Sequence, residues 1–175
     1  GAVMGDAIAS VLQVTGHTVE REYYINDAGN QVGVLGWSVM LRYYELFGRS
    51  ITMPEGCYPA EYVVDIAKAL QEKDGEKWLS VELDMSAPPP MEVVNFAMDM
   101  IMGWIKGELG TVNIHFDNWF SERTLHDDGK IEETIEKLTA KDLIYEGVLA
   151  PPKGKLPDDW EARPQLLFKS TKYGD

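Results

Sequence analysis

Polar side chains stand at the end of an aromatic, apolar run near the start of the chain. Residues 19–25 are rich in β-branched and aromatic side chains, which predicts a buried strand, and Asn26 and Asp27 follow it directly. A helical pattern begins at once, so Gly29 is expected to let the backbone turn tightly into the next helix. Open parallel sheets bind ligands at the carboxyl ends of their strands. The sequence therefore predicts that this strand end lines a ligand-binding crevice.

A second candidate carboxylate, Asp117, follows an alternating segment at 112–116 that predicts another strand, with a loop after it. If the two strands are parallel neighbours, Asp117 faces the same edge of the sheet as Asn26 and Asp27. A carboxylate there can hold an ammonium group or a ribose hydroxyl. The amides of Asn26 and Gln31 can each donate and accept hydrogen bonds. The alternative for Asp27 is that it merely caps the following helix.

Apolar periodicity places helices around the two predicted strands, and this helix–strand–helix order is what a parallel α/β sheet requires. The stretch from about 49 to 110 is predicted to be a helical excursion from the sheet layer and not a separate domain. Two parallel strands are too few for a self-standing sheet of this kind. Helices are predicted at about 3–12, 29–47, 62–70, 91–109 and 131–138, the last capped by Asp127 or Asp128, and short strands at 143–146 and 165–170.

The composition is that of a globular protein, with 45% apolar and 26% charged residues. A net charge of −13 argues against non-specific electrostatic binding of nucleic acid, although local basic stretches occur at 153–155 and 169–172. No segment is apolar enough over a sufficient length to span a bilayer. The single Cys57 leaves no internal disulfide framework and is typical of a reducing, cytosolic setting.

Common catalytic and metal-binding motifs are absent from the sequence. It contains no Walker sequence, no Gly-x-Ser-x-Gly and no Gly-x-Gly-x-x-Gly. His17, His115 and His126 show no metal-ligand spacing with each other or with Cys57. Residues 121–123 form no recognisable nucleophile arrangement. We therefore predict no metal site in the chain.

A series of short segments runs in one order along essentially the whole chain: Gly1–Ala7, Arg21–Gln31, Ser38–Tyr43, Phe116–Arg123, Leu143–Gly147, Pro151–Gly154, Leu167–Thr171 and Tyr173–Asp175. In these segments the chain closely resembles the catalytic region of bacterial arginyl-tRNA synthetases, which are class I aminoacyl-tRNA synthetases. No single segment would suffice for this resemblance, but the ordered series is specific.

The resemblance implies a Rossmann-type α/β catalytic domain that activates arginine with ATP, with Mg²⁺ expected in the parent enzyme, and transfers it to tRNA(Arg) in the cytoplasm. Residues 1–142 would be the first half of that domain, including the helical excursion, and residues 143–175 the beginning of its connective insertion. Two class I signatures, a His-x-Gly-His-like sequence and a Lys-Met-Ser-Lys-Ser-like loop, stabilise the ATP phosphates in the family. Both are missing here, so we expect no catalytic residue in these 175 residues and no arginyl adenylate from them alone.

The resemblance also implies roles for individual residues. It carries Asn26, Asp27, Gly29 and Gln31 onto the strand-end motif that lines the adenylate pocket, and it makes Asp27 a candidate for binding the substrate ammonium group. Treated as an exposed surface site, Asp27 would change stability by less than ~1 kcal/mol when replaced by Asn. No contact with the arginine guanidinium is assigned. The family's connective insertion approaches the tRNA acceptor end, and the lysines there that could contact phosphate are Lys153, Lys155, Lys169 and Lys172.

Two other interpretations are compatible with the sequence. A naturally truncated, non-catalytic module of synthetase-like shape would also lack both signatures and would bind tRNA or a partner protein. The chain opens inside a family motif, which favours a fragment, and its pI near 4.6 makes a free-standing tRNA binder less plausible. A sister enzyme, cysteinyl-tRNA synthetase, shares the topology but usually carries zinc ligands, which are not arranged here. The oligomeric state is not predicted.

Overall fold

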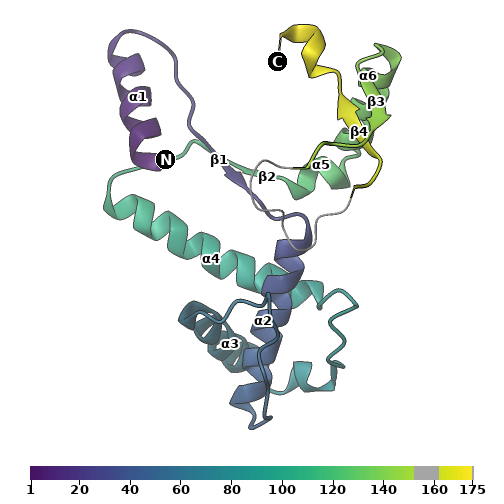
Figure 1. Cartoon of the computed structure of the whole chain (residues 1–175). Coiled ribbons are helices and arrows are strands. Elements are labelled where there is room, and N and C mark those ends of the chain that lie inside the picture. Colours follow the sequence, from purple (N-terminus) through teal and green to yellow (C-terminus); the bar gives the residue numbers. More distant parts are fainter. Residues whose placement is uncertain (152–161, 175) are drawn as a thin grey trace. The chain divides into compact units, whose positions relative to one another are not determined.

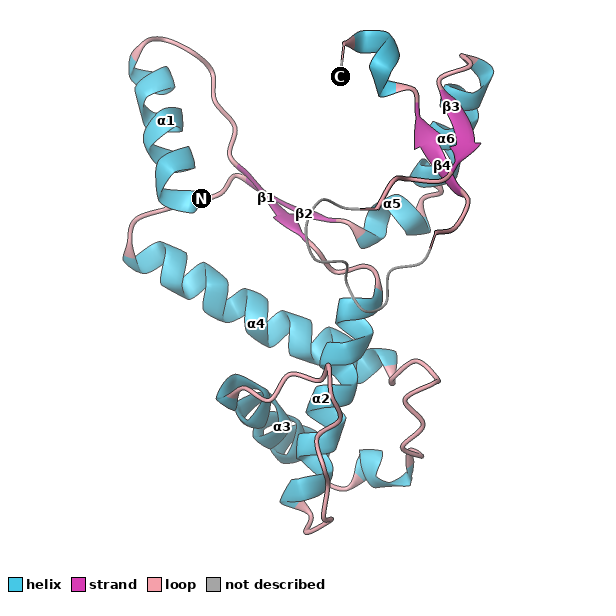
Figure 2. Cartoon of the chain, in the orientation of Figure 1, coloured by secondary structure: helices cyan, strands magenta, loops and turns pink. Residues whose placement is uncertain are grey.

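The computed structural model describes residues 1–151 and 162–174, and these form two compact units, Gly1–Arg123 and Thr124–Asp175. Helices dominate, and each unit contains one pair of strands (Figure 2). The first unit contains α1 (Ala2–Val14), β1 (Glu22–Ile25), α2 (Asn30–Leu46), α3 (Glu61–Asp74), a 3-10 turn (Lys77–Ser80), α4 (Met91–Thr111) and β2 (Asn118–Ser121). The second contains α6 (Lys130–Ala140), β3 (Ile144–Gly147), β4 (Gln165–Phe168) and a 3-10 turn (Ser170–Tyr173), and α5 (Arg123–Asp127) begins at the boundary.

The core of the first unit lies between α2, α3 and α4, which pack side by side (Figure 1). Helix α2 presents the largest buried side chains, and Tyr43 and Tyr44 are completely buried. The Tyr44 hydroxyl lies 3.0 Å from the Trp78 carbonyl oxygen and also within hydrogen-bonding distance of the Val81 carbonyl oxygen. The predicted helices at 29–47 and 91–109 are confirmed, whereas α3 is longer than the 62–70 predicted. The residues of the predicted excursion therefore share a core with α2.

The second strand of the chain is not where the sequence pattern predicted it. Residues 112–116 are not a strand, because Asn113 adopts a left-handed conformation with φ +59° and closes α4. The Asn113 and Ile114 amides donate to the carbonyls of Gly110 and Leu109, which is the Schellman arrangement at a helix end. The strand instead forms at Asn118–Ser121, inside the segment predicted to be a loop.

Strands β1 and β2 pair in parallel, with Tyr23 opposite Trp119. These two rings stack at 4.7 Å between centroids, and the Lys106 ammonium of α4 lies 4.6 Å from the Trp119 ring centroid. Because β2 starts at residue 118, Asp117 lies at the amino end of the pair, where its carboxylate accepts a 2.7 Å hydrogen bond from the Arg21 amide. The prediction that Asp117 shares an edge with Asn26 and Asp27 is therefore wrong.

Within the second unit, β3 and β4 pair in antiparallel fashion, close to the strands predicted at 143–146 and 165–170. Helix α6 has an i,i+4 ion pair between Glu133 and Lys137 at 2.6 Å. Its N-cap is Gly129 with no side-chain cap bond, so neither Asp127 nor Asp128 caps it as predicted.

Helix α1 has an uncovered apolar face. It ends at Val14, and its residues Val3, Met4, Ile8 and Val11 are each more than half exposed. Apolar faces of this kind are typical of surfaces that contact another segment or chain. No helix among the described residues is long and apolar enough to cross a membrane.

Candidate functional site

The turn after β1 is held in an unusual backbone conformation. Its last residue, Gly29, has φ +85° and ψ −175°, a region that is essentially restricted to glycine. Gly29 is also the N-cap of α2, and no atom outside its immediate neighbours lies within 4 Å of the position that a Cβ would occupy. The predicted role of Gly29 as the residue that turns the chain into α2 is confirmed. The open space beside it leaves the backbone accessible from that side.

The Asp27 carboxylate links the two parallel strands. Its Oδ2 accepts a 2.6 Å hydrogen bond from the Ser121 hydroxyl at the end of β2, and its Oδ1 accepts a 2.9 Å bond from the Arg123 amide. Arg123 is the first residue of α5, so this bond satisfies an amide that has no partner within its own helix. Helix α2 has no side-chain cap, so the alternative that Asp27 caps the following helix is wrong.

Asp27 is in its charged form at neutral pH. Burial raises the pKa of this carboxyl, but the hydrogen bonds from Ser121 and Arg123 and the positive charge of Arg123 together outweigh burial and hold the pKa below its ordinary value. Next to it, the hydrogen bond to the Glu122 carboxylate raises the pKa of Tyr24, and desolvation and the charges of Glu122 and Asp27 raise it further. The strand end therefore carries negative charge on Asp27 and Glu122.

Asn26 and Gln31 are exposed at the same turn. Among the residues that the structure describes, neither side chain has a hydrogen-bond partner, so both amides can bind a ligand. The structure thus brings Asn26, Asp27, Gly29 and Gln31 to one end of the β1–β2 pair. It separates them from Asp117.

The residues at the carboxyl end of β2 were missed as part of this site. Ser121 is the last residue of β2, Glu122 and Arg123 follow it, and the three contact Asp27, Ile25 or Tyr24. The sequence could have indicated these residues. Polar residues directly after a strand are expected at the same sheet edge as the polar residues after its parallel neighbour. That signal was lost because the strand was predicted six residues too early.

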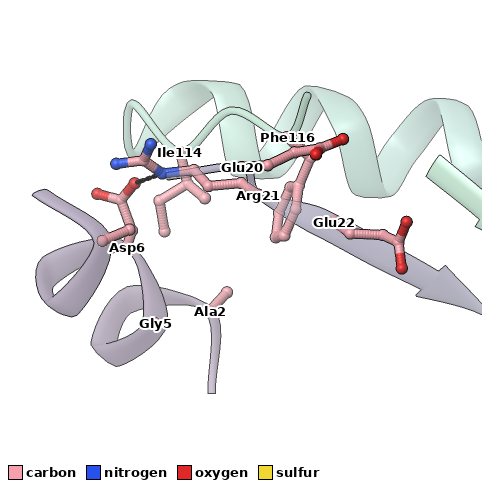
Figure 3. A pocket seen from close by; sticks show the side chains of 9 residues that line it. Ala2, Gly5, Asp6, Glu20, Arg21, Glu22, Ile114 and Phe116 are labelled. Carbon is pink, nitrogen blue, oxygen red and sulfur yellow. Dashed lines mark hydrogen bonds and ion pairs between the residues drawn. The ribbon is translucent and has the colours of Figure 1, made fainter. Parts of the chain in front are cut away.

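A cavity of about 200 Å³ lies at the other end of the strand pair, beside α1 (Figure 3). Arg21 directly precedes β1, and its side chain points toward α1, where it forms a 2.9 Å ion pair with Asp6 and longer hydrogen bonds to Ser10 and Gln13. Arg21 and Asp6 are thus paired with each other. This cavity contains none of the predicted site residues.

The predicted tRNA-contacting lysines are only partly described. Lys169 forms a 2.6 Å ion pair with Asp142, and this hydrogen bond lowers the pKa of the Asp142 carboxyl. Lys172 is exposed in the 3-10 turn that follows β4. Lys153 and Lys155 lie outside the described residues. For residues 1–151 and 162–174, no group of three or more His, Cys, Asp or Glu side chains is arranged to hold a metal ion.

Comparison with known proteins gives a consistent result. The chain is 55% identical over all 175 residues to an arginine–tRNA ligase from Magnetococcus marinus and 50% identical to one from Ruegeria sp.. It spans about 30% of the length of these relatives. No protein-family model matches the chain.

The fold is similar to that of a solved relative. A crystal structure described as an arginyl-tRNA synthetase from Campylobacter jejuni matches with a TM-score of 0.76 and 32% identity, covering 100% of this chain and 34% of that one. The predicted resemblance and the α/β class I synthetase fold class are therefore confirmed. Over its whole length, the chain corresponds to one segment of arginine–tRNA ligases.

Proposed function

We propose that the chain is the part of an arginine–tRNA ligase that forms one wall of the adenylate pocket. The whole enzyme would activate arginine with ATP and transfer it to tRNA(Arg) in the cytoplasm. The observation that carries this proposal is the match of all 175 residues to arginine–tRNA ligases at up to 55% identity. A polar turn at the carboxyl end of a parallel strand pair supports the placement of the pocket.

In this proposal each residue of the turn has a separate role in binding the substrate. Asn26 and Gln31 present amides that can bind the ribose or the amino acid, and the backbone at Gly29 lies open to a ligand. Asp27 supplies negative charge for the substrate ammonium group while its carboxylate holds the end of β2 and Arg123 in place. Because Ser121 and Arg123 already donate to the Asp27 carboxylate, a substrate ammonium group would have to donate to the lone pairs that these two bonds leave free.

The remaining parts of the reaction belong to other segments of such an enzyme. Neither class I signature occurs in these 175 residues, so contacts with the ATP phosphates are not assigned to them. Mg²⁺ is expected to accompany ATP, but the described residues offer no cluster of ligands for it. Lys153, Lys155, Lys169 and Lys172 are proposed to contact tRNA phosphates.

A chimera tests the proposal. Residues 1–175 would replace the matching segment of the Magnetococcus marinus ligase, and arginine-dependent ATP–pyrophosphate exchange and tRNA charging would be measured. We expect activity within about tenfold of the unmodified ligase, and no exchange from the 175-residue chain alone. A chimera that folds, by circular dichroism and gel filtration, yet catalyses no exchange would refute the proposal, as would exchange by the isolated chain.

The alternative is a naturally truncated, non-catalytic module that binds tRNA or a protein. Sequencing the source gene on both sides of these codons separates the two functions. A His-x-Gly-His-like sequence just upstream and several hundred codons downstream are expected for the ligase. A start codon at Gly1 or a stop codon soon after Asp175 would favour the module.

A further inference from the structure

The Arg123 side chain connects the turn after β1 to helix α4. Its Nε and one terminal nitrogen both lie 3.2 Å from the Asp27 carbonyl oxygen, and its other terminal nitrogen donates to the Asn95 side-chain oxygen at 2.8 Å. The Arg123 amide also donates to the Asp27 carboxylate. One residue therefore holds Asp27 through both its backbone and its side chain.

A guanidinium is suited to this arrangement because its donors lie in one rigid plane. Fixing the Asp27 carbonyl oxygen fixes the orientation of the peptide group that leads into Ala28 and Gly29. Gly29 has a strained backbone and no packing at its Cβ position, so the turn is not held by side-chain contacts there. Hydrogen bonds from Arg123 supply the restraint that packing does not.

Helix α4, to which Arg123 is hydrogen-bonded, is itself held in place by packing in the core. Its residues Val93, Val94 and Ala97 are buried in the core with α2 and α3. Asn95 lies between them in sequence on the exposed face of the same helix, within reach of Arg123. Besides the direct chain connection into α2, a second connection from the core to the turn therefore runs through Asn95 and Arg123.

We infer that Arg123 is the positioning residue of the ligand-binding turn: it sets where Asn26 and Asp27 stand relative to the helical core, with Asn95 orienting its guanidinium. This inference rests on the proposed function, because it is the adenylate pocket that the turn would line. In this inference Arg123 acts through Asp27 and is assigned no contact with the substrate. Errors in the position of binding groups of about 1 Å can lower a rate about 100-fold, so its removal is expected to act mainly on kcat.

The test uses the active chimera with Ala or Lys at position 123 and Ala or Asp at position 95. Arg123→Ala is expected to lower kcat for ATP–pyrophosphate exchange by about 10- to 100-fold, with KM for arginine and ATP changed less than about threefold. Lysine cannot reach both acceptors, so Arg123→Lys should not restore the rate, whereas added guanidinium ion should restore part of it in Arg123→Ala. Asn95→Ala should lower kcat about three- to tenfold, and Asn95→Asp, which keeps the acceptor, should retain the rate.

The double variant and a control make the test specific. Because both residues act through one contact, Arg123→Ala with Asn95→Ala should be no slower than Arg123→Ala alone. Arg49→Ala is the matched control, since Arg49 also donates to a backbone carbonyl, that of Leu79, but lies away from the turn. Its kcat should equal that of the unmutated chimera. Full kcat in Arg123→Ala, or independent additive losses in the double variant, would overturn the inference.

Hydrogen exchange separates failure of this inference from failure of the proposed function. Amides of residues 28–31 should exchange about tenfold faster in Arg123→Ala than in the unmutated chimera, whether or not either catalyses the reaction. Unchanged exchange overturns the positioning role even in an active enzyme. An inactive unmutated chimera refutes the proposed function instead. If Arg123→Ala does not fold, the Asn95→Ala and Asn95→Asp pair decides, because equal rates in these two overturn the inference.

Discussion

Replacing Asp27 by Asn tests whether charge at this carboxylate holds the two strands together. The carboxylate accepts bonds from the Ser121 hydroxyl at 2.6 Å and from the Arg123 amide at 2.9 Å. A hydrogen bond to a charged group contributes about 1.5–3 kcal/mol, and a neutral one about 0.5–1.5 kcal/mol. Asn can keep both contacts, because its oxygen accepts from Arg123 and the Ser121 hydroxyl can rotate to accept from its amide.

The loss in the variant is therefore the charge contribution of two bonds, about 2 kcal/mol, reduced because the site is partly open to solvent. We expect the free energy of opening β1–β2 to fall by about 1–2 kcal/mol at neutral pH, more than the value below ~1 kcal/mol expected for an exposed surface residue. Hydrogen exchange of the β1 and β2 amides should accelerate about 5- to 30-fold.

The pH dependence gives an independent check. The pKa of Asp27 is lowered from 3.8 in the folded chain, so its stabilisation is fully present above pH 3.8 and is lost as the pH falls through the lower folded pKa. Wild type and variant should therefore converge in acid. Asp99→Asn, the same change on the exposed face of α4, is the control. Equal exchange in the Asp27 and Asp99 variants, or a difference that persists in acid, would refute the reasoning.

Two further predictions concern the 175-residue chain. Tyr44→Phe removes a hydroxyl that serves two buried carbonyl groups and should lower the free energy of unfolding by about 1–3 kcal/mol in urea titrations, whereas Tyr173→Phe, at an exposed ring, should change it little. Gly29→Ala should destabilise by about 1–3 kcal/mol because Ala tolerates its backbone angles poorly, while Gly107→Ala, inside α4 with open space at the Cβ, should stabilise by about 0.5–1 kcal/mol. Opposite signs for the two glycines are the decisive result.

Sequence periodicity predicted the long helices best. Helices α2 and α4 were recognised because apolar residues recur at helical spacing over four turns or more. Strand β2 was misplaced because residues 112–116 alternate between apolar and polar side chains as a strand does. The left-handed conformation of Asn113, which makes those residues a helix end, depends on where α4 stops. Gly110 was an equally plausible stop by its residue type, and a short strand gives no competing signal.

The misplacement of one strand changed the chemistry assigned to two carboxylates. Asp117 was expected to share the ligand edge, whereas it holds the amino end of the pair through Arg21. Asp27 was predicted at the right edge, but Ser121, the last residue of β2, and Arg123, which lies just beyond it, already donate to its two carboxylate oxygens. The oxygens of a carboxylate at a strand end can accept hydrogen bonds from residues at the same end of the neighbouring parallel strand. Those residues cannot be identified from the sequence until the register of the two strands is known. In the proposed pocket, the side-chain amides of Asn26 and Gln31 are therefore expected to bind a ligand more strongly than Asp27. The main role expected of Asp27 is to hold the turn in position.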